Sequence, residues 1–504
     1  MVIPKRRLGA MTANTALRNP EVGIAARWRD AVVGAWAVRA VRMGTLGSCL
    51  IFVGSLTPAF LPTDTALHRL WLLRSLQDGA GRVVATAVLL LGVLLLLSAW
   101  LRLYPRDDGI DVSRATLVLW SLPLLLAPPL FSDDAYSYAA QGRIVQLGMD
   151  PYAVGPAQLG GSFASQVDPI WLNTPAPYGP LALQIQHVVV SLFGGNAYAS
   201  AVAMRVPALI ALVVIVTLVP RLARTFGKDP RFALWLGVLN PLTVLHLLGG
   251  AHNDAVMIAL VVVALWLATK RHLVLASLAV ALAATVKQPA LVAVVAVGLL
   301  CAPAPLPSRF ESWTRARWAH VAAASAMALA GFAAITAATG LGYGWIGAMG
   351  VPGQVRNYLA PSTSLGALLE IALRFLGQDG GADLALTVTR DLALLGCALV
   401  LAWLVLRRAP RQPVTSLVLM FLAIVVFAPT VQPWYMLWGG VLLGLTTLGR
   451  VHLRAATWLT AFFACFGVIV YSAHNGILAF GVSAGLGVLW IVTGHDRELV
   501  HPDK

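Results

Sequence analysis

The sequence predicts an all-α integral membrane protein, a polytopic helical bundle with about 13–15 transmembrane helices. Of its 504 residues, 59% are hydrophobic and only 11% are charged, and the mean hydropathy is +0.79. A soluble domain carries about 25% charged residues, so the composition excludes an ordinary soluble fold. Apolar segments separated by short basic loops repeat along most of the chain, which is typical of such a bundle.

A polar arm, residues 1–43, precedes the first apolar segment, and this layout does not fit a cleavable signal peptide. A single membrane domain, 44–493, follows, and a short tail, 494–504, ends the chain. Segments apolar enough to span a bilayer lie near residues 44–62, 83–101, 115–130, 198–220, 232–249, 254–269, 272–286, 289–303, 319–338, 387–406, 414–430, 434–448, 455–471 and 475–493.

The basic residues predict the orientation of these segments. With a cytoplasmic N-terminus, most Lys and Arg residues fall on the inner side, for example around 221–231, 309–317 and 407–411, as the positive-inside rule requires. Both termini are then cytoplasmic in a multi-pass plasma-membrane protein. Topology therefore explains the net charge of +15, and no nucleic-acid partner is predicted. No Walker or dinucleotide-binding motif is present.

Two long loops, 131–197 and 339–386, fall on the predicted outer side. Each contains a moderately apolar stretch, 181–195 in the first and 362–376 in the second. Both stretches suit interfacial or re-entrant helices. The alternative is that one of them spans the membrane and a neighbouring segment does not.

Two adjacent carboxylates, Asp133 and Asp134, directly follow the apolar segment 115–130. Ionisable side chains at the rim of a bilayer are costly and usually carry function. One of them could act as the base of a membrane glycosyltransferase and take the proton from an acceptor hydroxyl. The alternative is that the pair only stabilises the N-terminus of a helix running to about Leu147.

Other polar clusters also fall on the outer side, whereas a transporter would more naturally place such residues at mid-membrane. Each cluster has a purely structural alternative: a turn, a snorkelling lysine or an aromatic belt, and the belt is also the favoured role of Tyr136 and Tyr138. The clusters are Thr174–Pro180, His252-Asn253-Asp254, Lys287-Gln288-Pro289, Arg356-Asn357-Tyr358, Gln432-Pro433-Trp434-Tyr435 and His474-Asn475.

Candidate binding residues come from these clusters and from Arg205, which lies one to two turns inside its apolar segment. Cations for a lipid phosphate are Lys287, Arg205 and Arg356. His252 and Asp254 would lack a third ligand for a metal ion, so no metal site is predicted. Candidates for contact with the sugar or the acceptor are Tyr178, His252, Asn253, Asp254, Gln432, Trp434 and Tyr435.

The same stretches resemble a known family, the polyprenol-phosphate-mannose-dependent α-(1→6)-mannosyltransferases of actinobacterial lipomannan and lipoarabinomannan synthesis, which have the GT-C architecture. TPAPYGP and VQPWY, at their relative positions, are the more specific parts of the match. The matching stretches are 131–141 (FSDDAYSYAAQ), 150–156 (DPYAVGP), 174–180 (TPAPYGP), 233–240 with His252-Asn253, 287–289 (KQP), 342–345 (GYGW) and 431–435 (VQPWY).

The resemblance implies an inverting mannosyltransferase on the outer face of the plasma membrane. The donor would be polyprenyl-phosphate-mannose, and the acceptor a phosphatidylinositol mannoside or lipomannan extended through α-(1→6) bonds. Asp134, or failing that Asp133, would be the base, while Lys287, Arg205 or Arg356 stabilises the departing phosphate. No obligatory metal cofactor is expected, because a monophosphate leaving group needs less cation assistance than a nucleoside diphosphate.

Three alternatives remain open from the residues themselves. The chain could be a transporter or flippase of a lipid-linked sugar. It could be a GT-C transferase for another sugar or acceptor. It could also be a non-catalytic membrane partner, for which Asp133 and Asp134 would be dispensable.

Overall fold

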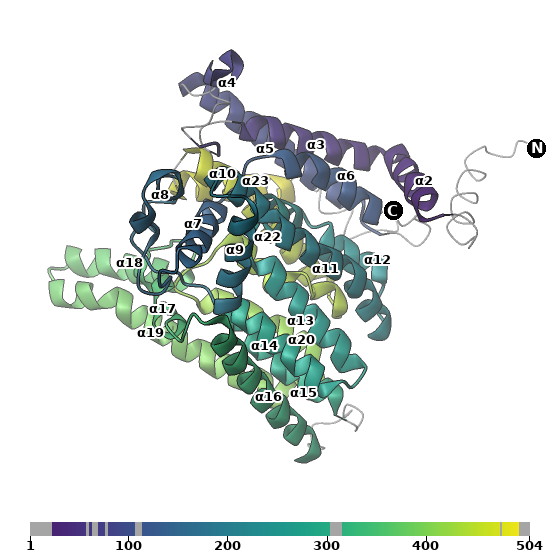
Figure 1. The fold of residues 1–504 in the computed structure, drawn as a ribbon, viewed down its shortest axis with the longest axis vertical. Helices are drawn as coiled ribbons and strands as arrows, with labels where there is room; N and C mark the ends of the chain where they lie inside the picture. Colours follow the sequence, from purple (N-terminus) through teal and green to yellow (C-terminus); the bar gives the residue numbers. More distant parts are fainter. Residues whose placement is uncertain are drawn as a thin grey trace, which may run out of the picture. The chain divides into compact units, whose positions relative to one another are not determined.

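The computed structural model describes residues 23–56, 60–62, 69–75, 79–105, 113–302, 315–473 and 476–492. These residues form helices and no strand, which confirms the predicted all-α fold (Figure 1). The predicted tail lies outside the described residues, as do His474-Asn475 and residues 1–22 of the arm. The described part of the arm is helical from Ile24.

The chain folds into two compact units. Unit 1 comprises residues 1–131, 229–249 and 448–504, and unit 2 comprises 132–228 and 250–447. The predicted membrane domain, 44–493, therefore contains two separately packed bodies, and each is described by itself.

Unit 1 is built on a close pair of apolar helices, α3 and α5. A Cβ atom added to Gly47 would lie 2.6 Å from the carbonyl oxygen of Gly92, so only glycine lets the two backbones approach this closely. Such small-residue contacts are typical of membrane helix pairs. Its helices are α2 (Ile24–Ala37), α3 (Arg39–Ser55), α4 (Trp71–Ser75), α5 (Gly79–Arg102), α6 (Ser113–Leu126), α12 (Pro230–Ala233), η3 (Leu234–Val238), η4 (Thr243–Gly249), α22 (Arg450–Ala473) and α23 (Gly476–Val492).

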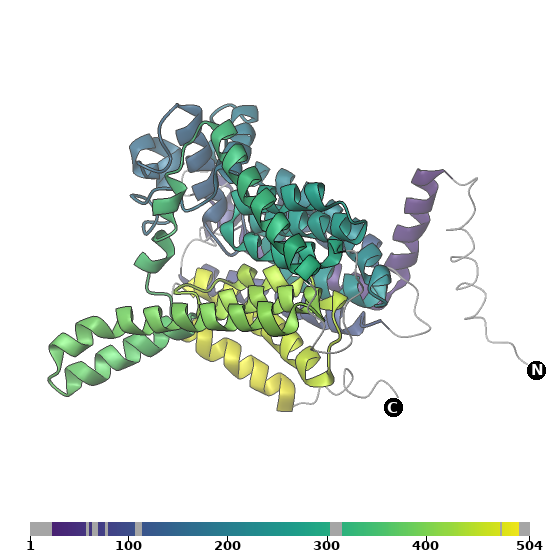
Figure 2. The same ribbon diagram turned by 90° about the horizontal axis from the view of Figure 1, so that it is seen from below.

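In unit 2, α14 packs against both α13 and α16, and this unit carries the polar residues of interest. Figure 2 shows α18 and α19 running side by side as a two-helix hairpin. Its helices are α7 (Asp134–Gln146), η2 (Pro156–Leu159), α8 (Gly161–Ser165), α9 (Pro180–Leu192), α10 (Ala197–Ala203), α11 (Arg205–Thr225), α13 (Asp254–Thr269), α14 (Leu273–Val286), η5 (Gln288–Val292), α15 (Ala293–Cys301), α16 (Arg315–Thr339), α17 (Trp345–Ala348), η6 (Val351–Gln354), α18 (Pro361–Phe375), α19 (Asp379–Trp403), η7 (Leu404–Arg408), α20 (Pro413–Phe427), η8 (Pro433–Met436), α21 (Leu437–Gly440) and η9 (Leu443–Leu445).

The helices identify a multi-pass membrane protein. Within the described residues, five helices are long and apolar enough to cross a bilayer, or seven if each of two bent helix pairs is one span. Several of the apolar segments counted in the expected 13–15 form helices of only 10–17 residues. A straight crossing takes about 20 residues.

Prolines and extended residues shorten these helices. At the end of α14, Lys287 adopts an extended backbone (φ −152°, ψ 121°) before Pro289, and the chain continues as the 3₁₀ turn η5. The two stretches expected to be interfacial form α9 and α18, each with proline at its first position. Proline there loses no helical hydrogen bond, because the first N–H groups of a helix are unpaired anyway.

Candidate active site

The acidic pair lies at the start of α7, as the sequence predicts. Asp133 is the N-cap residue, but its side chain makes no capping hydrogen bond. Instead, the hydroxyl of Ser132 accepts a hydrogen bond of 3.0 Å from the backbone N–H of Asp134. Capping by the side chain of Asp133 therefore does not explain the pair, although both carboxylates still lie at the favourable end of the helix dipole.

The carboxylate of Asp134 is held by two buried side chains. The hydroxyl of Tyr138, one helical turn further along α7, donates to it at 3.1 Å. The Nδ1 atom of His252 lies 3.4 Å from the same oxygen. Because Tyr138 is only 1% exposed and Tyr136 only 5%, the predicted role of these tyrosines as aromatic-belt anchors is wrong: an anchor must reach the membrane surface.

His252 is fully buried and stacks on Trp434. The ring centroids are 3.7 Å apart and the planes differ by 19°. His252 follows Ala251, whose positive φ of 56° is unusual for a residue with a Cβ atom. Residues held in that region cost of order 1–3 kcal/mol and cluster at functional sites.

Asp254 and Lys287 form a buried ion pair. Their side-chain atoms are 2.8 Å apart, and the side chain of Asp254 is inaccessible to solvent. The indole N–H of Trp438 donates to the same carboxylate oxygen at 2.5 Å. The ammonium of Lys287 also lies 4.4 Å from the ring centre of Tyr435 and 5.2 Å from that of Trp438. Lys287 is therefore turned inward into an aromatic corner rather than snorkelling outward.

We refer to these residues as the Asp134–Lys287 cluster. All of them belong to unit 2 and come from α7, the turn before α13, the end of α14, and the segment η8–α21. The cluster consists of Asp134, Tyr138, His252, Asp254, Lys287, Trp434, Tyr435 and Trp438.

Tyr178 packs at the edge of the cluster. Its ring meets that of Tyr138 edge to face, with centroids 5.2 Å apart. The next residue, Gly179, donates to the carbonyl of Val286, and a Cβ atom at Gly179 would lie only 2.2 Å from the carbonyl oxygen of Thr285. The TPAPYGP segment is thus docked on the end of α14, directly before Lys287.

The remaining candidates are less closely tied to the cluster. The amide oxygen of Asn253 lies 3.5 Å from the hydroxyl of Tyr138. Gln432 is half-buried, and its backbone carbonyl accepts from the N–H of Tyr435 at 3.0 Å. Both lie within two residues of cluster residues in the chain, and their predicted contact with sugar stays a prediction.

The two arginines proposed as phosphate ligands lie in different surroundings. Arg205 begins α11, is 3% exposed, and interacts electrostatically with Tyr136 and Tyr198. Arg356 is half-exposed and forms an ion pair of 2.8 Å with Glu370 on α18. Of the three predicted cations, Lys287 is the one that the structure places in the cluster.

Sequence reasoning missed Trp438 altogether and misassigned Tyr138. A signal for both was available. Trp438 lies four residues after Trp434, and Tyr138 lies four residues after Asp134. Side chains four residues apart on a helix share one face. This spacing indicates that Tyr138 lies beside Asp134 and that Trp438 lies on the same side as Trp434.

The two aspartates are in opposite electrostatic environments. Burial, followed by the charges of Asp168 and Asp134, raises the pKa of Asp133 to about 7. Burial also acts to raise the pKa of Asp134, but the hydrogen bond and charge of His252 and the charge of Lys287 outweigh it, so that this pKa is lowered. Environments that separate the pKa values of two carboxyl groups are a common device in acid–base catalysis.

A small cavity lies behind the cluster, lined in part by Tyr138, Gln186, His252 and Asn253. Its volume of about 20 Å³ suffices for about one water molecule and not for a hexose. Among the residues that the structure describes, no three His, Cys, Asp or Glu side chains are grouped closely enough to hold a metal ion.

Two family models match the sequence. One is described as alpha-(1->6)-mannopyranosyltransferase, N-terminal domain, and matches residues 41–303. The other is described as MptB C-terminal domain and matches residues 362–490. The whole Asp134–Lys287 cluster falls within these two ranges, whereas Arg356 lies between them.

Curated relatives match over most of their length. Alpha-(1->6)-mannopyranosyltransferase A of Mycobacterium tuberculosis is 32% identical over 406 residues, covering 79% of this chain and 78% of the relative. The A protein of Corynebacterium glutamicum is 32% identical over 387 residues, covering 72% and 79%. The B protein of the same organism is 28% identical over 496 residues, covering 89% and 78%.

Proposed function

The chain belongs to the alpha-(1->6)-mannopyranosyltransferase family, and from this membership we propose that it transfers mannose from polyprenyl-phosphate-mannose to a mannan acceptor. The acceptor is a phosphatidylinositol mannoside or lipomannan, and the reaction takes place on the outer face of the plasma membrane. The orientation rests on the distribution of basic residues, which favours a cytoplasmic N-terminus and an outer position for the loops that follow the acidic pair.

The observation that carries this proposal is that one cluster contains both the Asp134 carboxylate and the Lys287 ammonium. Asp134 is oriented by Tyr138 and His252, and Lys287 is oriented by Asp254. His252 and Asp254 are separated by one residue, so the same short segment contacts both Asp134 and Lys287. A transferase needs a base for the acceptor hydroxyl and a positive charge for the departing phosphate, and the cluster supplies both.

The proposed reaction is a single displacement. Asp134 takes the proton of the acceptor 6-hydroxyl while its oxygen attacks C1 of the donor mannose. The bond between C1 and the phosphate oxygen breaks, and polyprenyl phosphate leaves with the bonding electrons, stabilised by the ammonium of Lys287. A β-linked donor then gives an α-linked product, because one displacement inverts the anomeric carbon.

Aromatic side chains suit the remaining contacts. Tyr178 and Tyr435 have partly exposed rings, which can pack on a sugar face or on the first isoprene unit, whereas Trp434 is 3% exposed and lies against His252. No obligatory divalent metal takes part in the proposed reaction, since one ammonium group can offset the charge of a phosphate monoester as it forms.

The test is mannose transfer by the full chain in native membranes. Synthetic polyprenyl-phosphate-mannose and a short α-(1→6)-linked mannoside are the substrates, with and without EDTA. We expect an α-(1→6)-extended product whose linkage is read by NMR, at a rate that EDTA does not change. The absence of product with any mannoside acceptor would contradict the proposed activity, and a loss of rate with EDTA would contradict the metal-free mechanism.

A further inference from the structure

The turn before α13 and the first residue of α13 carry two side chains that a substrate cannot reach. His252 and Asp254 are both 0% exposed. Each nevertheless contacts a partly accessible group, since the side chain of Asp134 is 19% exposed and that of Lys287 is 11% exposed. The predicted role of His252 and Asp254 as sugar ligands does not fit this arrangement.

The contacts of His252 fix the direction of one carboxylate oxygen. Stacking on Trp434 sets the plane of the imidazole, and its Nδ1 atom lies 3.4 Å from the Asp134 oxygen that also accepts from Tyr138. These two contacts on one oxygen orient the carboxylate, whose side chain is 19% exposed and so partly accessible to a substrate. A donor oriented by packing holds its acceptor with little loss of side-chain entropy at the moment of reaction.

The contacts of Asp254 fix the ammonium of Lys287 in the same way. One oxygen of Asp254 receives hydrogen bonds from both Lys287 and Trp438. The ammonium has three N–H groups, of which one donates to Asp254 and one is shared with Tyr435, so that one remains for a phosphate. A buried lysine without this counter-charge would be costly, so the carboxylate also keeps Lys287 charged.

The backbone of the turn is itself constrained. Ala251 has the positive φ of 56° at the entrance, and the helix α13 begins at Asp254. Only Asn253 separates the two buried residues. A strained residue on one side and a regular helix on the other leave the turn little freedom, so that the positions of His252 and Asp254 are set together.

We propose that His252 and Asp254 are positioning residues: one rigid turn sets the Asp134 carboxylate and the Lys287 ammonium at a fixed separation, and neither residue touches the sugar. This inference rests on the proposed function for the roles of Asp134 and Lys287. It changes the role that the sequence indicated for the turn, from sugar recognition to the alignment of base and cation.

The first experiment compares three variants of one residue type. In His252→Ala the donor to Asp134 is lost, and we expect kcat to fall by about 100-fold with the acceptor KM nearly unchanged, as for a misplaced catalytic group. His252→Asn can donate from an amide near the Nδ1 position and should recover most of the rate. The matched control is His187→Asn on α9, which removes a half-buried imidazole bonded to Gln184 and should leave both constants unchanged.

Two results of this experiment would overturn the inference for His252. One is a rise in acceptor KM with kcat unchanged, which is the behaviour of a sugar ligand. The other is equal activity of the Ala, Asn and wild-type proteins. Size-exclusion elution and Tm in detergent are measured for every variant, and the Asn variant gives the comparison if the Ala variant does not fold.

The second experiment is a double-mutant cycle between Asp254 and Lys287, read out by binding of polyprenyl phosphate. This ligand is the proposed leaving group, and its binding needs no turnover. We expect Asp254→Asn and Lys287→Gln each to weaken binding by about tenfold, and the double variant to bind like either single variant, because Asp254 acts only through Lys287. Effects that multiply would mean that Asp254 contacts the ligand directly, and the inference would be wrong.

The two proposals can fail separately. A wild-type protein that binds polyprenyl phosphate but transfers no mannose refutes the proposed function. In that case the double-mutant cycle still tests the role of Asp254, because it measures binding alone. A wild-type protein that transfers mannose with multiplicative effects in the cycle keeps the proposed function and loses the inference.

Discussion

Unit 2 contains two groups of charged residues that look alike in sequence but differ in surroundings. The Asp134–Lys287 cluster contains two carboxylates, a lysine and an imidazole among aromatic rings. The hairpin network joins Arg356, Glu370, Arg374 and Asp383 on and beside α18 and α19, with ion-pair distances of 2.8–3.2 Å. Both groups fall in or next to the segments predicted to lie on the outer side.

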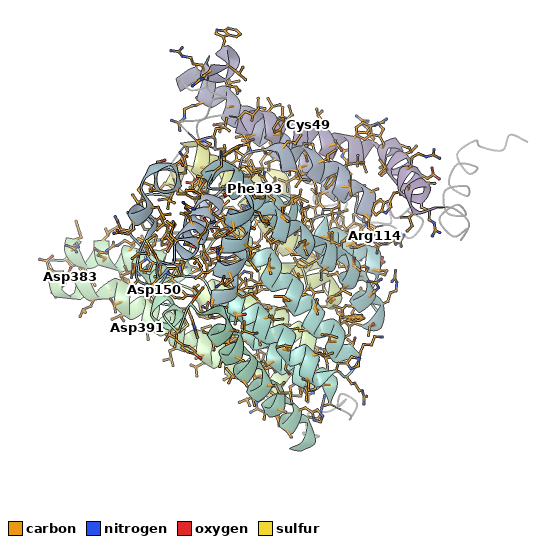
Figure 3. The ribbon with its side chains drawn as sticks, viewed as in Figure 1. Cys49, Arg114, Asp150, Phe193, Asp383 and Asp391 are labelled. Carbon is orange, nitrogen blue, oxygen red and sulfur yellow. The ribbon has the colours of Figure 1, made fainter. Side chains whose placement is uncertain are left out.

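Burial separates the two groups. In the cluster, Asp254 and His252 are inaccessible to solvent. In the hairpin network, the side chains of Arg356, Arg374 and Asp383 are between 51% and 69% exposed, and Figure 3 shows Asp383 at the end of the hairpin. Exposed ion pairs are screened by water and salt, whereas buried charges interact strongly and shift one another's protonation. Charge clusters at one predicted face are therefore not equivalent, and burial distinguishes the cluster that we propose for catalysis.

The largest expected effect is the loss of the proposed base. Asp134→Asn should lower kcat for mannose transfer by about a thousandfold, since general base catalysis contributes about 10²–10⁴. The matched change in the other group, Asp383→Asn, should leave kcat unchanged. Initial rates with saturating donor and acceptor measure both. Transfer by Asp134→Asn at the wild-type rate would show that Asp134 is not the base.

The two cations give the next largest contrast. Lys287→Ala should lower kcat/KM for the lipid donor by about 100-fold, because it removes the positive charge opposite the departing phosphate. Arg356→Ala should change this constant by less than about twofold, since its guanidinium already pairs with Glu370. Donor titrations at fixed acceptor provide the measurement. The reverse order of effects would move the phosphate site to the loop before α18.

The pH profile tests which aspartate is the base. A base must be ionised, so a base with a lowered pKa, as for Asp134, gives a kcat/KM that stays level between pH 6 and 8. If Asp133 were the base, its pKa of about 7 would make the rate at pH 6 about tenfold lower than the plateau. We expect the level profile. A rise with a midpoint near 7 that disappears in Asp133→Asn would assign the base to Asp133.

The raised pKa of Asp133 also predicts how the stability of the protein depends on pH. Its pKa is raised in the folded protein above the ordinary value of 3.8, so the folded state holds its proton more tightly than the unfolded state. The contribution of this group to stability is therefore present below about pH 4 and is lost as the pH rises through about 7. Asp133→Asn should raise Tm at pH 8 relative to the wild type and have little effect on Tm at pH 4.

The sequence predicted the helical membrane fold and most of the cluster because the signals are local. Apolar length indicates a membrane helix, and ionisable residues at helix ends indicate function. Asp134, Lys287 and Trp434 all belong to short motifs that such reasoning finds. The structure brings together motifs that are more than a hundred residues apart in the chain.

Other features depend on packing and were not predictable in this way. The sequence did not show that His252 stacks on Trp434 or that Trp438 donates to Asp254, because both contacts join distant segments. It also placed Arg356 beside Lys287 as an equal candidate, since sequence does not reveal that Glu370 lies within reach of Arg356. Apolar length also does not show where a helix breaks, as it does at Lys287.

The smallest expected effect belongs to the hairpin network. Glu370 joins Arg356 and Arg374, so Glu370→Gln weakens both ion pairs at once. Because exposed pairs gain little over their contacts with water, we expect Tm in detergent to change by no more than about 2 °C and kcat to remain at the wild-type value. Added salt should reduce even this difference, since it screens exposed charges.

The buried pair of Asp254 and Lys287 should respond differently, with a clear fall in Tm for Asp254→Asn that salt does not remove. Equal shifts for Glu370→Gln and Asp254→Asn would mean that burial does not distinguish the two groups.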